Sequence, residues 1–355
     1  MIFKDKKILV TGGTGSMGKK LVHRLLAGEL GTPRKVIVLS RDEAKQHDMR
    51  ISYLHRRVST DEVIYNNFVN VLEFRIGDVR SYDDVCSAVK GADIVINAAA
   101  LKQVPTCEYF PVQAVMTNCM GAYNIARAIE EQAYPVDTVV GISTDKACKP
   151  VNVMGMTKAV QERVFVAANI LNQKTRFVCV RYGNVLASRG SVIPLFHDQI
   201  RNGGPVTITS PEMTRFLLSL DDAVDTVFAA LKEAKRGETY VPRAPSATVM
   251  NIARALIGPR DISIKTIGIR PGEKLHEVLI SEEEIHHCVS RRAYYAIQPM
   301  LPELRESTLS EPNTLAKEYS SGDDVLDLPG TAALLTKHRL MADDADLGDR
   351  PELLR

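Results

Sequence analysis

Apolar positions along the chain follow two alternating patterns. Short β-branched runs are typical of buried strands, and longer stretches with apolar residues three and four apart are typical of helices that bury one face. Helix-like stretches such as SMGKKLVHRLLAGEL and NVMGMTKAVQERVFVAANIL separate the strand-like runs. This alternation predicts an α/β fold whose doubly wound parallel sheet has helices on both faces. The strand-like runs are KILVTGG (7–13), KVIVLS (35–40), VLEFRIGD (71–78), DIVINAA (93–99), TVVGIST (138–144) and FVCVRYGNV (177–185).

The alternation ends after residue 186, which indicates a division into three parts. We expect residues 1–186 to form the main α/β domain and residues 187–300 to form a smaller C-terminal substrate-binding lobe. Parts of 205–235 are expected to pack back on the first domain. Residues 301–355 are polar and rich in Ser, Asp, Pro and Glu, a composition that predicts a loosely packed tail.

A glycine-rich loop separates the first predicted strand from the first predicted helix. Glycine lets the backbone turn tightly and approach a pyrophosphate, which the free N–H groups of the helix then bind. In this strand–turn–helix context, the loop predicts a Rossmann-type dinucleotide-binding domain over residues 1–186. The candidate contacts in the loop are Gly12, Thr14, Gly15, Ser16, Met17 and Gly18.

The end of the second predicted strand, VLSRDE, bears on the choice of cofactor. Ser40 and Arg41 are suited to a 2′-phosphate, which favours NADP. Asp42 stands where a carboxylate can bond a ribose 2′-hydroxyl, so NAD is the alternative. Further candidate cofactor contacts follow the third and fourth strands and the next helix. They are Asp78, Val79, Ala98, Ala99, Ala100 and Asn118.

Composition and charge narrow the class of protein. The chain has 355 residues and a formal net charge of +2, so no long-range field toward nucleic acid is expected. The six cysteines are scattered without a CxxC pair, and no secretory signal precedes KKILVTGG. The run ADIVINAAAL is about half as long as a membrane-spanning helix. We therefore expect a cytoplasmic protein without a membrane segment, and His286 and His287, which point to different faces, predict no metal site.

Several motifs in matching order give the chain a family resemblance. They are TGGTGSMG, IGDVR, NAAALKQVP, TN at 117–118, STDKA, MGMTK, VRYGNVLASRGSVIP, MTRF and IRPGEKLHE. From about residue 5 to residue 300, the chain resembles extended short-chain dehydrogenase/reductase enzymes. More narrowly, it resembles the bacterial UDP-N-acetylglucosamine 4,6-dehydratases of surface-glycan synthesis. Members of the family commonly form homo-oligomers through their helices.

The resemblance implies a lyase that uses its cofactor catalytically. Hydride leaves C4 of the sugar for the nicotinamide, water is lost across C5 and C6, and the hydride returns to C6. The family assigns the acid to Asp145 and the base to Lys146. Burial moves both pKa values toward neutrality, whereas ion pairing opposes this, so we expect the two side chains to point at different atoms. We also expect Thr144 to orient the C4 hydroxyl while Asp145 or Lys146 takes its proton.

Met154 stands four residues before Lys158, where most relatives in the larger superfamily have a catalytic Tyr. Some 4,6-dehydratases also carry Met at this position, so the substitution does not by itself indicate a dead enzyme. Lys158 is expected to bond the nicotinamide ribose. The C5 configuration is expected to be retained; an inverting dehydratase, a UDP-sugar 4-epimerase and a non-enzymatic nucleotide-binding regulatory protein are the alternatives.

A UDP-sugar pocket is expected beside these residues. Arg215 and Arg270 are candidates for the diphosphate, because Arg offers paired donors. The loop SRGSVIP (188–194) resembles the family's loop over the nucleotide. The full set of candidate substrate contacts is Lys102, Asn184, Val192, Arg215, Arg270 and Glu273.

Overall fold

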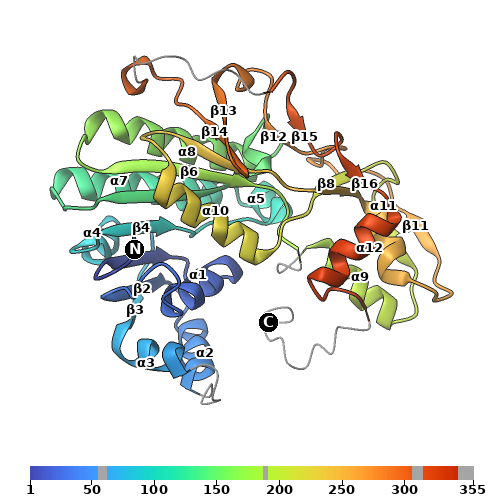
Figure 1. Ribbon diagram of the computed structural model, residues 1–355, viewed down its shortest axis with the longest axis horizontal. Coiled ribbons are helices and arrows are strands. Elements are labelled where there is room, and N and C mark those ends of the chain that lie inside the picture. Colours follow the sequence, from blue (N-terminus) through green and yellow to red (C-terminus); the bar gives the residue numbers. More distant parts are fainter. Residues whose placement is uncertain (55–61, 187–190, 306–314, 343–355) are drawn as a thin grey trace.

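The predicted strands meet in one sheet that runs through the molecule (Figure 1). The computed structural model describes residues 1–54, 62–186, 191–305 and 315–342. Within these ranges the sheet has the strand order β13-β14-β9-β6-β5-β4-β1-β2-β3. Its strands are β1 (Lys7–Thr11), β2 (Lys35–Ser40), β3 (Leu72–Ile76), β4 (Ile94–Asn97), β5 (Thr138–Thr144), β6 (Arg176–Tyr182), β9 (Thr239–Pro242), β13 (Cys288–Arg291) and β14 (Tyr294–Ile297).

The strands from β1 to β6 are parallel and lie in the order 3-2-1-4-5-6 of a doubly wound fold. Each coincides with a predicted run to within a few residues. The runs were recognisable because a parallel sheet that is covered on both faces buries consecutive side chains, as β5 does from residue 138 to residue 143. The predicted fold class is therefore confirmed.

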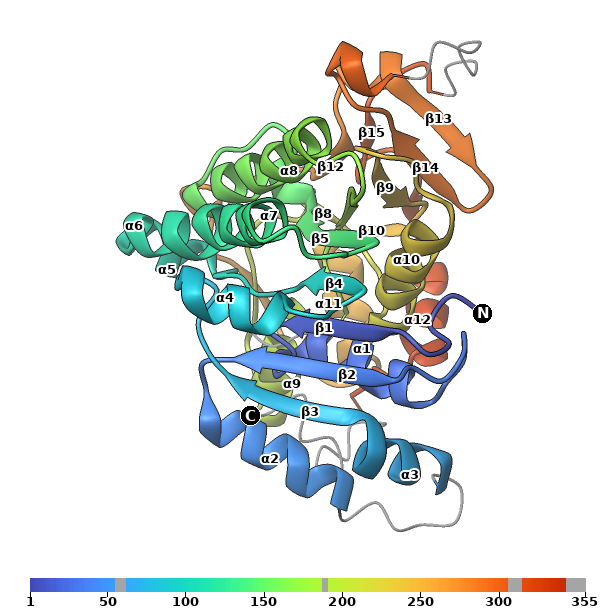
Figure 2. The same ribbon diagram turned by 90° about the vertical axis from the view of Figure 1, so that its left-hand side faces the viewer.

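Helices cover both faces of this sheet (Figure 2). On one face, α1 packs beside α10, and Leu21, Leu25 and Val227 join the core between these helices and the strands. On the other face, α4, α7 and α8 bury residues such as Ile129 and Phe165. Within the described ranges, no helix is long and apolar enough to span a bilayer. The helices of this part are α1 (Ser16–Leu26), α2 (Glu43–Leu54), α3 (Glu62–Val71), α4 (Tyr82–Val89), α5 (Val104–Tyr109), α6 (Pro111–Ala114), α7 (Gly121–Glu131), α8 (Val153–Leu171) and α10 (Leu220–Glu233).

The second half of the chain contributes to the main sheet and also builds a smaller layer beside it. β9 pairs with β6, and β14 and β13 extend that edge in the antiparallel sense. The smaller layer has a core that includes Phe196, Ile252 and Leu256. Its elements are β7 (Val206–Ile208), β8 (Thr214–Phe216), β10 (Ser246–Thr248), β11 (Ile264–Thr266), β12 (Val278–Ile280), β15 (Tyr319–Ser320), β16 (Val325–Leu326), α9 (Val192–Arg201), α11 (Val249–Ile257) and α12 (Leu328–Lys337).

The structure differs from the expected loosely packed tail between residues 315 and 342. β15 pairs with β12, β16 pairs with β10, and α12 packs against α11. Leu335 on α12 is completely buried, and Ser321 is buried beside β8. The tail is polar on average, so these few apolar positions were not recognised in the sequence. They are enough to pack the segment against the smaller layer. Residues 306–314 and 343–355, also part of that prediction, lie outside the described residues.

Candidate active site

The glycine-rich loop forms a close cradle at the carboxyl end of β1. Gly12 has a φ of +64°, and a Cβ there would lie 2.7 Å from the Cα of Ala99. A Cβ on Gly18 would overlap the carbonyl oxygen of Gly12. Gly15 caps α1 without a side-chain hydrogen bond, so the first N–H groups of this helix can bind an anion. This geometry fits the pyrophosphate of a dinucleotide.

The end of β2 carries both kinds of residue that are expected to contact the ribose of a cofactor, a guanidinium and a carboxylate. Ser40 is buried, with its Oγ 2.8 Å from the Oγ1 of Thr14. Arg41 remains half-exposed, 3.6 Å from the carboxylate of Asp78. Asp42 pairs with Lys45. A guanidinium and a carboxylate thus lie together at this edge, which fits either NADP or NAD.

Two further predicted cofactor positions have structural partners. Asn118 is completely buried in a π-helical segment, Val115–Met120. Its Oδ1 accepts the N–H of Leu101, and its Nδ2 donates to the Oγ1 of Thr157 at 2.9 Å. Asn118 therefore ties the segment after β4 to α8. Val79 packs against Gly121, where a Cβ would lie 2.9 Å from its side chain.

The segment Ala98–Ala100 follows β4 along the cradle. The N–H of Ala99 donates to the Oγ1 of Thr11, which itself donates to Asn97. Ser16 and Met17 lie in the first turn of α1, directly after the cradle. Small side chains at 98–100 keep the backbone close to Gly12, as a passing cofactor requires.

Met154 and Lys158 share the buried side of α8 but have different surroundings. Met154 packs in an apolar cluster with Cys107 and Ala114. Lys158 donates its Nζ to the Oε1 of Gln161 at 2.6 Å, and burial lowers the pKa of Lys158 to about 8. The Met154 side chain is therefore part of the core, whereas Lys158 is a buried amine that loses its proton more easily than an exposed lysine does.

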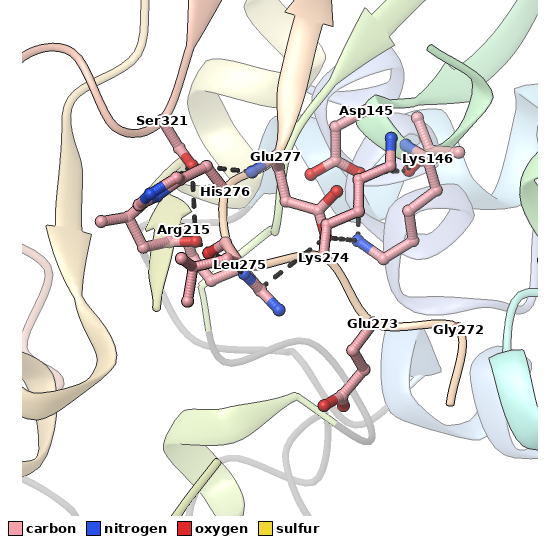
Figure 3. Close-up of polar contacts among 12 residues, drawn as sticks. Asp145, Lys146, Arg215, Gly272, Glu273, Lys274, Leu275, His276, Glu277 and Ser321 are labelled. Atoms are coloured by element: carbon pink, nitrogen blue, oxygen red, sulfur yellow. Dashed lines mark hydrogen bonds and ion pairs between the residues drawn. The ribbon is translucent and has the colours of Figure 1, made fainter. Parts of the chain in front are cut away.

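Thr144, Asp145 and Lys146 form one cluster where β5 ends in a 3₁₀ turn, Asp145–Ala147. Figure 3 shows Asp145 and Lys146 side by side. Thr144 donates its Oγ1 hydrogen to the Oδ1 of Asp145 at 2.7 Å. The Nζ of Lys146 lies 3.1 Å from the same oxygen. We expected the Asp145 carboxyl and the Lys146 amine to point at different atoms. This expectation is wrong, because the tight turn brings the amine next to an oxygen of the carboxyl itself.

A second carboxylate, Glu277, completes this cluster. Its Oε1 lies 3.1 Å from the Nζ of Lys146 and 3.8 Å from the Nε of Arg215. Burial would lower the pKa of Lys146, but Asp145 and Glu277 outweigh it, so this pKa is raised. Burial is also the main cause of the raised pKa of Asp145. The expected shift toward neutrality therefore holds for Asp145 and fails for Lys146.

Glu277 was missed at the sequence level although it ends the quoted motif IRPGEKLHE. The motif directed attention to Arg270 and Glu273 instead. Arg270 is exposed, and Glu273 points away from the Asp145–Lys146 pair (Figure 3). In the sequence, Glu277 is recognisable only as a carboxylate next to the apolar strand β12. This position indicates that its side chain is buried, but not which residues it contacts.

The other predicted substrate contacts differ in their surroundings. Arg215 is buried and donates its Nη1 to the carbonyl oxygen of Thr214. The Oδ1 of Asn184 is buried with no hydrogen-bond partner among the described residues. Lys102 is exposed after β4, and Val192 begins α9.

Two other sequence predictions concern the loop over the nucleotide and the absence of a metal site at His286 and His287. Residues 188–190 of the loop SRGSVIP lie outside the described residues. His286 and His287 lie in a short 3₁₀ turn. In the part of the chain that the structure describes, no three His, Cys, Asp or Glu side chains are grouped as metal ligands.

The parallel sheet, the glycine cradle and the uncapped start of α1 define a protein with a Rossmann-like fold, which is the fold of the short-chain dehydrogenase/reductase enzymes that the chain resembles. A family model described as "Polysaccharide biosynthesis protein" matches residues 8–299, and the chain belongs to this family.

Individual relatives agree with this assignment. A protein named UDP-glucose 4-epimerase from Rickettsia bellii is 44% identical over 301 residues, which cover 83% of this chain and 84% of the relative. The X-ray structure of Pen from Bacillus thuringiensis is similar with a TM-score of 0.84 and 33% identity, covering 96% of this chain and all of that chain. The fold is also shared by the dTDP-glucose 4,6-dehydratase DesIV from Streptomyces venezuelae, solved with NAD and TYD bound. Its TM-score is 0.63 at 22% identity, covering 76% of this chain and 86% of that chain.

Proposed function

We propose that the protein is a nucleotide-sugar-modifying enzyme, and specifically a UDP-N-acetylglucosamine 4,6-dehydratase of the hydro-lyase class. Its product is a UDP-4-keto-6-deoxy-N-acetylhexosamine with the C5 configuration retained. The observation that carries the proposal is the buried cluster of Asp145, Lys146 and Thr144 at the carboxyl end of β5. Elimination of water needs an acid and a base on one sugar, and this cluster offers both.

Asp145 acts as the acid at the C6 hydroxyl, because burial raises the pKa of its carboxyl and so favours the protonated form. Lys146 acts as the base at C5, where the neighbouring ketone makes the hydrogen acidic. Its raised pKa makes it a strong base, which must lose its own proton before it can accept the one from C5. Thr144 orients the C4 hydroxyl while Asp145 or Lys146 accepts its proton. When bound, the nicotinamide cofactor supplies reversible electron storage, so the reaction has no net redox change.

The cofactor is NADP, supported by Arg41 beside the end of β2, with NAD as the alternative through Asp42. Lys158 bonds the nicotinamide ribose from α8. Arg215 and Arg270 hold the diphosphate, Glu273 meets the uridine ribose, and Lys102, Asn184 and Val192 line the sugar-nucleotide pocket. Arg41, Arg215 and Arg270 supply paired donors suited to phosphate oxygens.

Homo-oligomer formation is part of the proposal. Large apolar side chains are exposed along α5 to α8. Such contiguous exposure on one group of helices favours association between copies of the chain. The exposed members are Tyr109, Phe110, Val112, Val115, Met116, Met120, Tyr123, Met156 and Val160.

A UDP-sugar 4-epimerase is the second candidate, because the Rickettsia bellii relative carries that name at 44% identity. One assay separates the candidates: the protein is incubated with UDP-N-acetylglucosamine and NADP⁺, and products are followed by NMR. A 4-keto-6-deoxy product is expected. A C4 epimer would instead identify an epimerase, and binding without turnover a regulatory protein. With the reaction run in deuterium oxide, the configuration at C5 of the labelled product, read by NMR, separates retention from inversion.

A further inference from the structure

Glu277 is fixed beside Lys146 by the C-terminal part of the chain. Its side chain is 2% exposed and lies at the start of β12. The backbone N–H of Glu277 donates to the Oγ of Ser321 at 2.9 Å, and its carbonyl oxygen accepts the N–H of Ser321 at 2.8 Å. These two hydrogen bonds hold the Glu277 carboxylate where it meets Lys146 (Figure 3).

The two carboxylates that contact Lys146 are not equivalent. Glu277 faces the positive charges of Lys146, Arg215 and Lys274, which lower its pKa although burial opposes them. Asp145 is completely buried; Lys146 favours its charged form, while Glu277 repels it. The charged form is therefore easier to maintain on Glu277, and a proton held by the cluster resides on Asp145.

We propose that Glu277 is a positioning residue for the dehydration, holding the Lys146 side chain beside Asp145 and keeping the proton of the cluster on Asp145. The inference rests on the proposed function. If Glu277 loses its charge, Asp145 becomes the one described carboxylate within ion-pair distance of Lys146. Asp145 then ionises more readily, and Lys146 holds its proton less tightly.

A kinetic experiment tests this role with the full chain. Glu277→Gln is expected to lower kcat by roughly 10- to 100-fold, because the acid is less often protonated and Lys146 is less well placed. Both pKa values fall in this variant, so the whole pH profile of kcat moves to lower pH by roughly one unit. A fall in kcat without any movement of the pH profile would overturn the proposal. Glu282→Gln, at an exposed carboxylate paired with Lys149, is the matched control and is expected to behave as wild type.

A second readout needs neither substrate nor activity. Competitive acylation with acetic anhydride across pH, read by mass spectrometry at Lys146, reports the titration of its amine. In the wild type this amine is expected to titrate above 10.5, its ordinary value, and in Glu277→Gln the titration moves lower. Where Glu277→Gln does not fold, the wild-type titration decides, and a value at or below 10.5 overturns the inference.

The kinetic and acylation experiments distinguish a failure of the role proposed for Glu277 from a failure of the proposed function. A wild type that forms no 4-keto-6-deoxy product contradicts the proposed function, while acylation still tests the contact between Glu277 and Lys146. Glu277→Asp retains the charge on a shorter side chain. It is expected to lower kcat with less movement of the pH profile than Glu277→Gln, and a larger movement would contradict the role of charge.

Discussion

Gly155 lies directly against the backbone carbonyl oxygen of Lys146, so that a Cβ at position 155 would overlap this oxygen. Gly155→Ala is favoured by about 1 kcal/mol of helix propensity. The overlap is with backbone and cannot be relieved by rotating a side chain. We expect the variant to lose roughly 1–3 kcal/mol of unfolding free energy in urea titrations, with a lower kcat. Val151→Ala, at an exposed position before the same helix, is the control, and a Gly155→Ala protein of wild-type stability and rate would refute this expectation.

Lys146→Ala removes the proposed base. Dehydration is expected to fall by at least about 100-fold, because general acid–base catalysis contributes on that scale. Product formation by NMR measures the loss. Circular dichroism must show that the variant is folded. Dehydration at the wild-type rate would exclude Lys146 as the base.

Lys158→Met tests the buried amine on α8. The pKa of Lys158 is about 8 when folded against an ordinary 10.5, so between these values the unfolded chain binds a proton that the folded chain does not. The contribution of Lys158 to stability is therefore full above pH 10.5 and is lost as the pH falls toward 8. Relative to the variant, wild-type unfolding free energy is expected to rise by roughly 1–3 kcal/mol across this window.

Urea titrations at several pH values between 8 and 10.5 measure this difference. The exposed Lys174→Met is the control, and it is expected to leave the pH dependence unchanged. Parallel pH curves for wild type and Lys158→Met would show that the amine has its ordinary pKa in the folded chain.

Arg41→Ala distinguishes the two cofactors. Loss of the guanidinium is expected to weaken NADP binding by roughly 10- to 100-fold, while NAD binding changes little, because only NADP carries the 2′-phosphate. Calorimetric titration measures both affinities. Arg34→Ala, exposed near the opposite end of β2, is the control. Equal losses for both cofactors would assign Arg41 to another part of the site.

Val160→Asp tests the proposed oligomer. A charge on the exposed apolar side of α8 is expected to dissociate the assembly, because a buried unpaired carboxylate is costly. Light scattering after size-exclusion chromatography gives the mass. Val69→Asp on α3, which is 59% exposed, should leave the mass unchanged. A monomeric wild type would dismiss the oligomer outright.

The parallel sheet could be predicted from sequence because its signal is local. Except for β3, each parallel strand buries a run of consecutive, mainly apolar residues. Gly12 and Gly18 lie where a side chain would collide with the backbone of the turn after β1. Thr144, Asp145 and Lys146 were found as a group because they are adjacent in the chain. Their mutual contacts were not predictable, since the 3₁₀ turn that brings Lys146 onto Asp145 leaves no distinct sequence pattern.

Contacts between distant segments account for most of what was missed. Glu273 and Glu277 have the same chemistry and nearly the same position in the chain. Only the folded structure places Lys146 and Arg215 beside Glu277. Likewise, Ser321 is an ordinary polar residue in a polar stretch until β15 carries it to Glu277.

The two hydrogen bonds between Ser321 and Glu277 have a consequence for biosynthesis. The backbone of Glu277 acquires these partners only after the stretch around Ser321 has left the ribosome. A nascent chain can therefore assemble its nucleotide cradle early, while the placement of Glu277 beside Lys146 waits for nearly the whole polypeptide to be translated. Catalytic competence would then arrive as one of the last events of synthesis, and truncated translation products would bind coenzyme without turning over a sugar.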